Sequence, residues 1–157
     1  MQRQLTIAAL MLGLLAAPVL AREAEAVLAA VNGLRAKAGC PALVMNAKLV
    51  AAAQGHARAM AEQDFFGHAG RDGSRFSARI AAQGYSYSAA AENIAAGQAS
   101  AAAVVASWLE SAGHRRNMLN CNFRDTGIAV VYQPDDQPLP GNRSALRYYW
   151  VQEFAVP

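Results

Sequence analysis

Apolar residues recur at helical spacing in three separate parts of the chain, which predicts amphipathic helices over residues 24–38, 47–63 and 100–111. The repeating positions are Val27, Val31, Leu34 and Ala38 in the first, Leu49, Ala53, His56 and Met60 in the second, and Val104, Val105, Trp108 and Leu109 in the third. Asn46 is expected to cap the second helix. A short helix is predicted over 76–83.

The helical spacing of apolar residues ends before the C-terminal part of the chain, where the composition of two segments favours strands. Residues 127–132 are apolar on both faces, as in a covered central strand, and residues 146–154 are rich in Tyr, Trp, Val and Phe. The Pro-rich stretch 134–144 between them predicts a hairpin loop. Residues 85–93 alternate only weakly and fit a strand or an extended loop. This order predicts an α+β domain with helices on a small antiparallel sheet.

The N-terminus has the pattern of a secretory signal peptide. Arg3 precedes an apolar run over residues 5–20, and small residues lead to a cleavage site after Ala21. A retained membrane anchor is the alternative, although the run is shorter than the roughly 20 residues that span a bilayer. We therefore expect a signal peptide over 1–21 and one folded domain over 22–157, secreted or periplasmic, with no further membrane segment.

The amino-acid composition excludes several classes of protein. The chain has 157 residues, of which 54% are hydrophobic and 16% charged, and its net charge is +3. This balance excludes intrinsic disorder and suits one compact core. The basic residues are scattered, with Arg115–Arg116 the only adjacent pair, so nucleic-acid binding is not expected.

Cys40 and Cys121 are the only cysteines, and each lies at the end of a segment. Two thiols in an oxidising compartment usually pair, so we expect a structural disulfide. Two free buried thiols or a catalytic cysteine are the alternatives.

Three polar residues are not explained by packing: His68, His114 and Glu92. His56, in contrast, lies on an apolar stripe and is expected to be a core residue. Glu92 is a lone acid among small residues, where a carboxylate is costly unless it is paired or used. Two imidazoles and a carboxylate can hold a divalent cation or transfer protons. A purely structural hydrogen-bond cluster is the alternative.

Several motifs together resemble the CAP superfamily, which includes cysteine-rich secretory proteins, antigen 5 and pathogenesis-related proteins and is also named the SCP domain. The likeness is closest to its bacterial secreted branch and extends over about residues 25–155. The motifs are residues 34–39, Asp64–His68, Ala91–Ala95, Trp108–Leu119 and Tyr149–Phe154. The resemblance implies a single-domain α-β-α sandwich with a central cleft.

The clefts of this family are usually described by two histidines and two glutamates. His68, Glu92 and His114 match three of these positions. The fourth holds Ser111, with Glu110 one residue earlier. On a helix this offset turns a side chain by about 100°, so Glu110 is expected to point away from the cleft. Ser111 is expected to be a hydrogen-bond partner at a helix end.

The resemblance implies two functions. The first is a non-enzymatic module, expected to be monomeric, that binds lipid, sterol or a partner in the cell envelope. In it His68 and His114 hold zinc or another divalent cation, and Glu92 is a ligand or orients one. The alternative is a protease-like hydrolase in which His68, Glu92 and His114 are catalytic and activate water, with or without metal.

Overall fold

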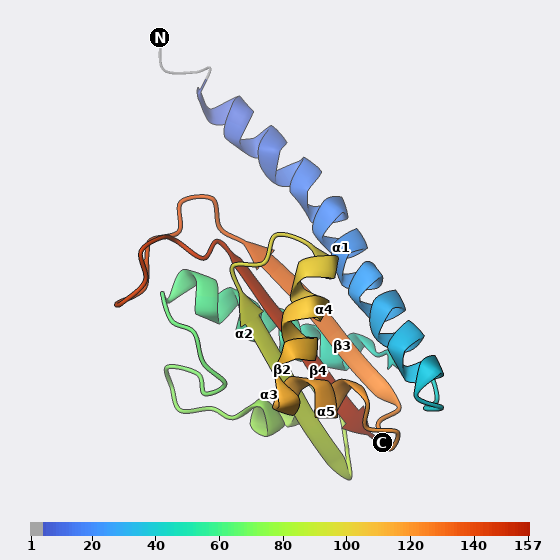
Figure 1. Ribbon diagram of the computed structural model, residues 1–157. Helices are drawn as coiled ribbons and strands as arrows, with labels where there is room; N and C mark the ends of the chain where they lie inside the picture. Colours follow the sequence, from blue (N-terminus) through green and yellow to red (C-terminus); the bar gives the residue numbers. More distant parts are fainter. Residues whose placement is uncertain (1–4) are drawn as a thin grey trace.

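The computed structural model describes the backbone of residues 5–157 and the side chains from Val19 onwards. This part of the chain forms five helices and four strands (Figure 1). In chain order they are α1 (Leu5–Lys37), β1 (Val44–Met45), α2 (Ala47–Glu62), α3 (Phe76–Ala82), β2 (Ala89–Ala96), α4 (Ala101–Glu110), α5 (Ala112–Met118), β3 (Asp125–Tyr132) and β4 (Tyr148–Val156).

The four strands form one mixed sheet in the order β1-β3-β4-β2. β4 pairs antiparallel with both β2 and β3, as expected. The sheet is not purely antiparallel, because β1 joins β3 in parallel through Val44 and Met45. This two-residue strand has no sequence signal of its own, since it exists only through its pairing with β3.

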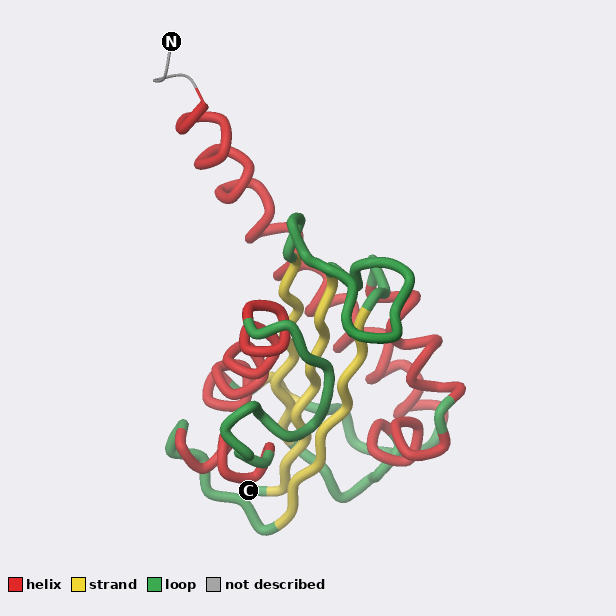
Figure 2. Tube along the Cα trace, turned by 90° about the vertical axis from the view of Figure 1, so that its left-hand side faces the viewer, coloured by secondary structure: helices red, strands yellow, loops and turns green. Residues whose placement is uncertain are grey.

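Helices cover both faces of the sheet, which makes the domain a three-layer α-β-α sandwich (Figures 1 and 2). On the face of α1, α4 and α5, the core centres on Trp108, Trp150 and Phe154. On the face of α2 and α3, it centres on Met60 and Tyr149, with smaller residues around them. The predicted fold class is therefore confirmed.

The helices expected over 47–63, 76–83 and 100–111 are present with shifts of at most one residue at each end. The Asn46 side chain caps α2 by accepting a hydrogen bond from the backbone N–H of Lys48. The stripe of α1 continues from Val31 to the fully buried Arg35, whereas Ala38 is exposed. The ambiguous segment contains β2. Helix α5 was not predicted, because its seven residues carry no apolar periodicity.

Helix α1 begins well before the expected first helix and runs without a break through the predicted cleavage site after Ala21. Its first half extends beyond the body of the domain (Figure 2). Leu20 packs against the core, while Val19 is exposed. Within the part of the chain that the structure describes, no helix is both long and apolar enough to cross a membrane. Signal cleavage remains a prediction.

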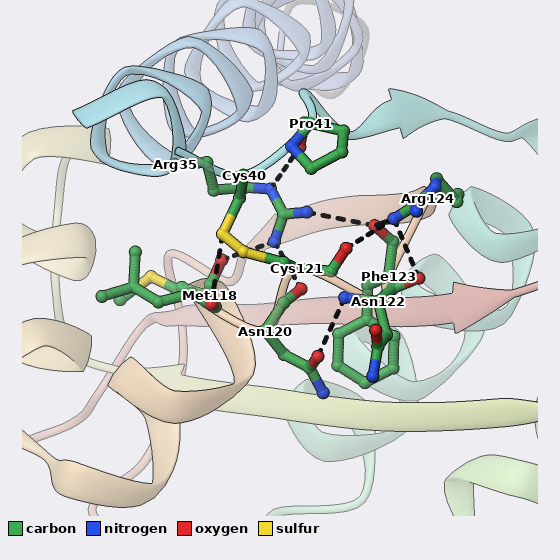
Figure 3. The surroundings of a disulfide bond; sticks show 10 residues. Arg35, Cys40, Pro41, Met118, Asn120, Cys121, Asn122, Phe123 and Arg124 are labelled. Carbon is green, nitrogen blue, oxygen red and sulfur yellow. Dashed lines mark hydrogen bonds between the residues drawn. A yellow bond between two sulfur atoms is a disulfide. The ribbon is translucent and has the colours of Figure 1, made fainter. Parts of the chain in front are cut away.

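Cys40 and Cys121 form the expected disulfide, which joins the segment after α1 to the loop after α5 (Figure 3). The Cα atoms of the two cysteines are 4.7 Å apart, and 81 positions separate them in sequence. The bond therefore ties the C-terminal end of α5, the helix that carries His114, to the start of the domain.

Candidate functional site

The candidate residues gather around β2, which forms one edge of the sheet. Glu92 lies on β2 itself. His68 lies in the loop between α2 and α3, on one side of the sheet, and His114 lies in α5, on the other side. Because β2 has no neighbouring strand on its outer edge, side chains from both helical layers can approach each other there.

The side chain of Glu92 is fully buried and accepts two short hydrogen bonds. The Nδ1 atom of His68 donates a hydrogen bond to Oε1 of Glu92 at 2.7 Å, and Nη2 of Arg79 donates to Oε2, also at 2.7 Å. Arg79 further binds the backbone carbonyl of His68. Burial alone would raise the pKa of Glu92, but the hydrogen bond from His68 and the charge of Arg79 outweigh it and lower that pKa. Glu92 is therefore an ionised group that fixes the ring of His68.

Glu153, which the sequence analysis did not single out, lies directly opposite Glu92 in the β2–β4 register. Its side chain is completely buried, and no described residue donates a hydrogen bond to either carboxyl oxygen. Burial and the negative charge of Glu92 raise the pKa of Glu153 well above its usual value. Glu153 is thus a neutral acid that can donate a hydrogen bond to the Glu92 carboxylate. The signal that pointed to Glu92, a lone acid in an apolar segment, applies equally to Glu153.

This pair leads to a prediction about stability and pH. The pKa of Glu153 is higher in the folded chain than in the unfolded chain, so the folded state holds its proton more tightly. The stability that this proton contributes is complete below about pH 4.5 and is lost as pH rises through the folded-state pKa. Glu153→Gln keeps the shape of the neutral acid and cannot ionise. We expect this variant to be more stable than the native chain by about 1 kcal/mol or more at pH 8.

Urea unfolding between pH 5.5 and 8.5 measures this difference. Glu110→Gln serves as the control, because Glu110 is exposed on α4 and its loss should leave the pH dependence unchanged. Parallel stability curves for the native chain and Glu153→Gln would contradict a neutral Glu153.

His56 is confirmed as a core histidine, with 1% of its surface exposed. Its Nε2 atom donates a hydrogen bond to the carbonyl of Gly67 at 2.8 Å. Burial lowers the pKa of His56, although the negative charge of Glu92 opposes this effect. The residue therefore supports the loop that carries His68 and is not a candidate ligand.

His114 is held in place by the contacts between α5 and β2. Asn93 Nδ2 donates to the backbone carbonyl of His114, and Asn117 Nδ2 donates to Asn93 Oδ1 at 2.9 Å. The imidazole of His114 packs against Trp108, with ring centroids 6.5 Å apart. Burial and the charge of His68 lower the pKa of His114, so its ring is neutral at neutral pH and has a lone pair available.

The residues at the end of α4 do not add a second glutamate to this site. Glu110 is exposed, and Ser111 lies between α4 and α5. The side chain of Ser111 makes no capping hydrogen bond, so the expectation that it serves as a partner at the helix end is wrong. Its backbone carbonyl instead accepts the N–H of Arg115, as an ordinary helix start does.

The donor set limits how a metal could be bound. In the described residues, no group of three or more His, Cys, Asp or Glu side chains is arranged to hold a metal ion. Both oxygens of Glu92 are occupied by His68 and Arg79. His68 is 55% exposed in its side chain, and only its Nδ1 atom is used. Two imidazoles with a carboxylate behind one of them are therefore the donors that the site offers.

Comparison with known proteins agrees with this architecture. The most similar solved structures include an extracellular protein with an SCP domain from Bacillus anthracis (TM-score 0.72, 23% identity, 86% of this chain and 40% of that chain) and an outer surface protein from Borrelia burgdorferi (TM-score 0.75, 20% identity, 86% and 92%). At these identities the likeness concerns the fold.

Two proteins of Bacillus subtilis are similar to this chain in sequence. The protein named Uncharacterized protein YkwD is 37% identical over 101 residues, covering 64% of this chain and 39% of YkwD. The Uncharacterized membrane protein YlbC is 30% identical over 99 residues, covering 63% of this chain and 29% of YlbC. The matched region is thus well under half of each relative. Residues 28–154 match the CAP family, described as the cysteine-rich secretory protein family. The chain belongs to the cysteine-rich secretory protein (CAP) family.

Proposed function

We propose that this chain is an exported, non-enzymatic binding module in which His68 and His114 hold a divalent cation such as zinc at the edge of β2. The observation that carries the proposal is the 2.7 Å hydrogen bond from His68 Nδ1 to Glu92. A carboxylate on one ring nitrogen fixes the tautomer, so the other nitrogen, Nε2, presents its lone pair outward. This is the usual arrangement behind a metal-binding histidine.

The bound ion would supply open coordination positions for a polar group of a ligand, since two protein ligands leave a tetrahedral ion half-filled. Lipid, sterol or an envelope protein partner are the ligand classes that we propose. Export is supported by the predicted signal peptide over 1–21 and by the disulfide. The extracellular and outer-surface descriptions of two structural relatives point the same way.

A hydrolase ranks second because neither carboxylate of the site is free to act as a base, and the free imidazole nitrogens are those that the proposal assigns to the cation. General-base activation of water requires a carboxylate or imidazole with an unoccupied acceptor directed at that water. Glu92 has both oxygens engaged, and Glu153 is buried with a raised pKa. Binding therefore fits the contacts better than turnover does.

Calorimetric titration of zinc at pH 7.5 tests the proposal. We expect one site per chain in the native protein and no measurable site in the double variant His68→Ala/His114→Ala. Glu92→Gln removes the carboxylate charge behind His68 and is expected to weaken zinc binding by about 10- to 100-fold. Binding should also weaken at acid pH, because protonated imidazole is not a ligand.

Glu110→Ala is the matched control, since it removes an exposed carboxylate of α4 and should bind zinc like the native chain. Equal zinc affinity in the native chain and the double histidine variant would overturn the proposal. Turnover of a peptide or ester library that Glu92→Gln abolishes would replace it with the hydrolase.

A further inference from the structure

The opposite edge of the sheet, at β3, is only partly paired. The backbone N–H of Val44 donates to the carbonyl of Arg124, and that of Asn46 donates to Thr126. Beyond Thr126 the β1 chain turns into α2, so the pairing stops. Along a strand, successive residues direct their N–H and C=O groups to alternate edges. The backbone N–H and C=O groups of Ile128 and Val130 therefore point to the same edge as those of Thr126. At Ile128 and Val130 the short strand β1 has already ended.

At the outer edge of β2, by comparison, side chains hydrogen-bond to the backbone carbonyls. By the same alternation, Glu92 and Ile94 direct their carbonyls outward. Trp108 Nε1 donates to the carbonyl of Ile94 at 3.0 Å, and Asn117 Nδ2 lies 3.4 Å from that of Glu92. At β3, in contrast, none of the residues described by the structure hydrogen-bonds to Ile128 or Val130 on this edge.

A groove of about 570 Å³ runs along this unpaired edge. Ile128, Ala129 and Val130 form its floor, and helices α1 and α2 provide its two walls. The wall residues include Ala24 and Leu28 from α1, Val50 and Gln54 from α2, and Met45 at one end. Nearly all the lining is apolar, and Glu25 is its one charged residue among those described.

We propose that this groove binds an extended, apolar peptide segment of a partner protein, which adds to the edge of β3 as a further strand. Ile128 and Val130 offer two N–H and two C=O groups, which one strand of about three residues can satisfy. The apolar walls suit aliphatic side chains, and Glu25 favours a basic residue beside them.

The shape of the groove decides between possible occupants. Ile128 and Val130 expose only 2% and 5% of their surface, so the floor is recessed between the helices. A helix about 10 Å wide does not present unpaired backbone groups to such a floor. A second copy of this chain carries the same recess, and two recessed edges cannot reach each other. A single extended segment is the occupant that fits both the width and the backbone groups.

The proposal is tested with a fluorescein-labelled hexapeptide that has three consecutive valines between lysines, titrated with the purified chain. We expect a saturable rise in anisotropy. The same peptide N-methylated at the first and third valines lacks the two N–H groups that face β3 and should bind at least about fivefold more weakly. Hydrogen exchange of the Ile128 and Val130 amides should slow when the unmethylated peptide is bound.

Two variants on α2 separate the groove from general adsorption. Gln54→Trp fills the groove and is expected to weaken binding by about tenfold or more. Ala51→Trp adds the same ring to the same helix at an exposed position outside the groove and should bind like the native chain. No binding of the peptide at all, or equal binding by Gln54→Trp, would overturn the proposal. Equal binding of the methylated peptide would also overturn it, since the groove would then hold apolar chains without strand pairing.

Discussion

Gly127→Ala is expected to lose most or all of its soluble, folded protein. Gly127 lies in β3 where α2 crosses the strand, and a Cβ atom there would lie well within 3.0 Å of the backbone of Leu49 and Val50. Leu49 is itself fully buried, so α2 cannot move away without opening the core. Overpacking of this kind costs at least about 3 kcal/mol, which is a large share of the stability of a domain this size.

Thermal unfolding measures this loss, and a fall in Tm of about 10 °C or more is expected for any Gly127→Ala protein that remains soluble. Gly55→Ala is the matched control. Gly55 is an exposed residue within α2, and nothing lies within 4 Å of the position its Cβ would take. This control should gain up to about 1 kcal/mol, because alanine favours helix over glycine. A Gly127→Ala protein that melts like the native chain would show that α2 and β3 do not approach this closely.

The contrast between these two glycines shows which parts of the fold could be predicted from the sequence. Helices α2 and α4 were predicted to within about two residues at each end, because apolar spacing and the Asn46 cap are local signals. The close approach at Gly127 and the pairing of β1 are tertiary features. They depend on where two distant segments meet, and nothing in either segment alone indicates it.

The site was predicted in part for a similar reason. His68, Glu92 and His114 were selected because packing did not explain them, and the structure places the first two in direct contact. Arg79 was missed, since a single arginine in a short helix is ordinary until its partner is known. Glu153 was missed because its segment was identified from its aromatic residues. Only the register between β2 and β4 brings the two glutamates face to face.

Arg35 is the most unusual buried group of the domain, since it is a cation with no exposed surface. Its Nε atom donates to the carbonyl of Pro41 and its two Nη atoms donate to the carbonyls of Met118, Asn120 and Phe123, at 2.8 to 3.0 Å (Figure 3). No carboxylate takes part in these contacts. Burial and the nearby Arg124 lower the pKa of Arg35, but a guanidinium remains charged in proteins.

Three of these bonds place the end of α5 and the loop after it on the end of α1, beside the disulfide, and the fourth holds Pro41 in the segment after α1. These carbonyls need a hydrogen-bond donor from elsewhere, because an irregular loop does not pair its own backbone N–H and C=O groups as a helix or a sheet does. One planar guanidinium with five donors can reach all of them, which a lysine ammonium with three donors cannot do. Arg35 therefore sets the position of the segment that leads back to His114.

Arg35→Met is expected to destabilise the chain by about 3 kcal/mol or more, because it removes four hydrogen bonds and leaves buried carbonyls without donors. Urea unfolding of oxidised protein measures this cost while the Cys40–Cys121 bond still tethers the loop. Arg58→Met is the control, since Arg58 is 60% exposed in its side chain, lies 3.9 Å from Glu62 and should change stability by no more than about 0.5 kcal/mol. Because Arg35 also positions α5, Arg35→Met should weaken the zinc binding that we propose at His114, even at temperatures where the chain remains folded. If Arg35→Met matches Arg58→Met in both stability and zinc affinity, the disulfide alone holds the loop, and the buried cation has no structural role.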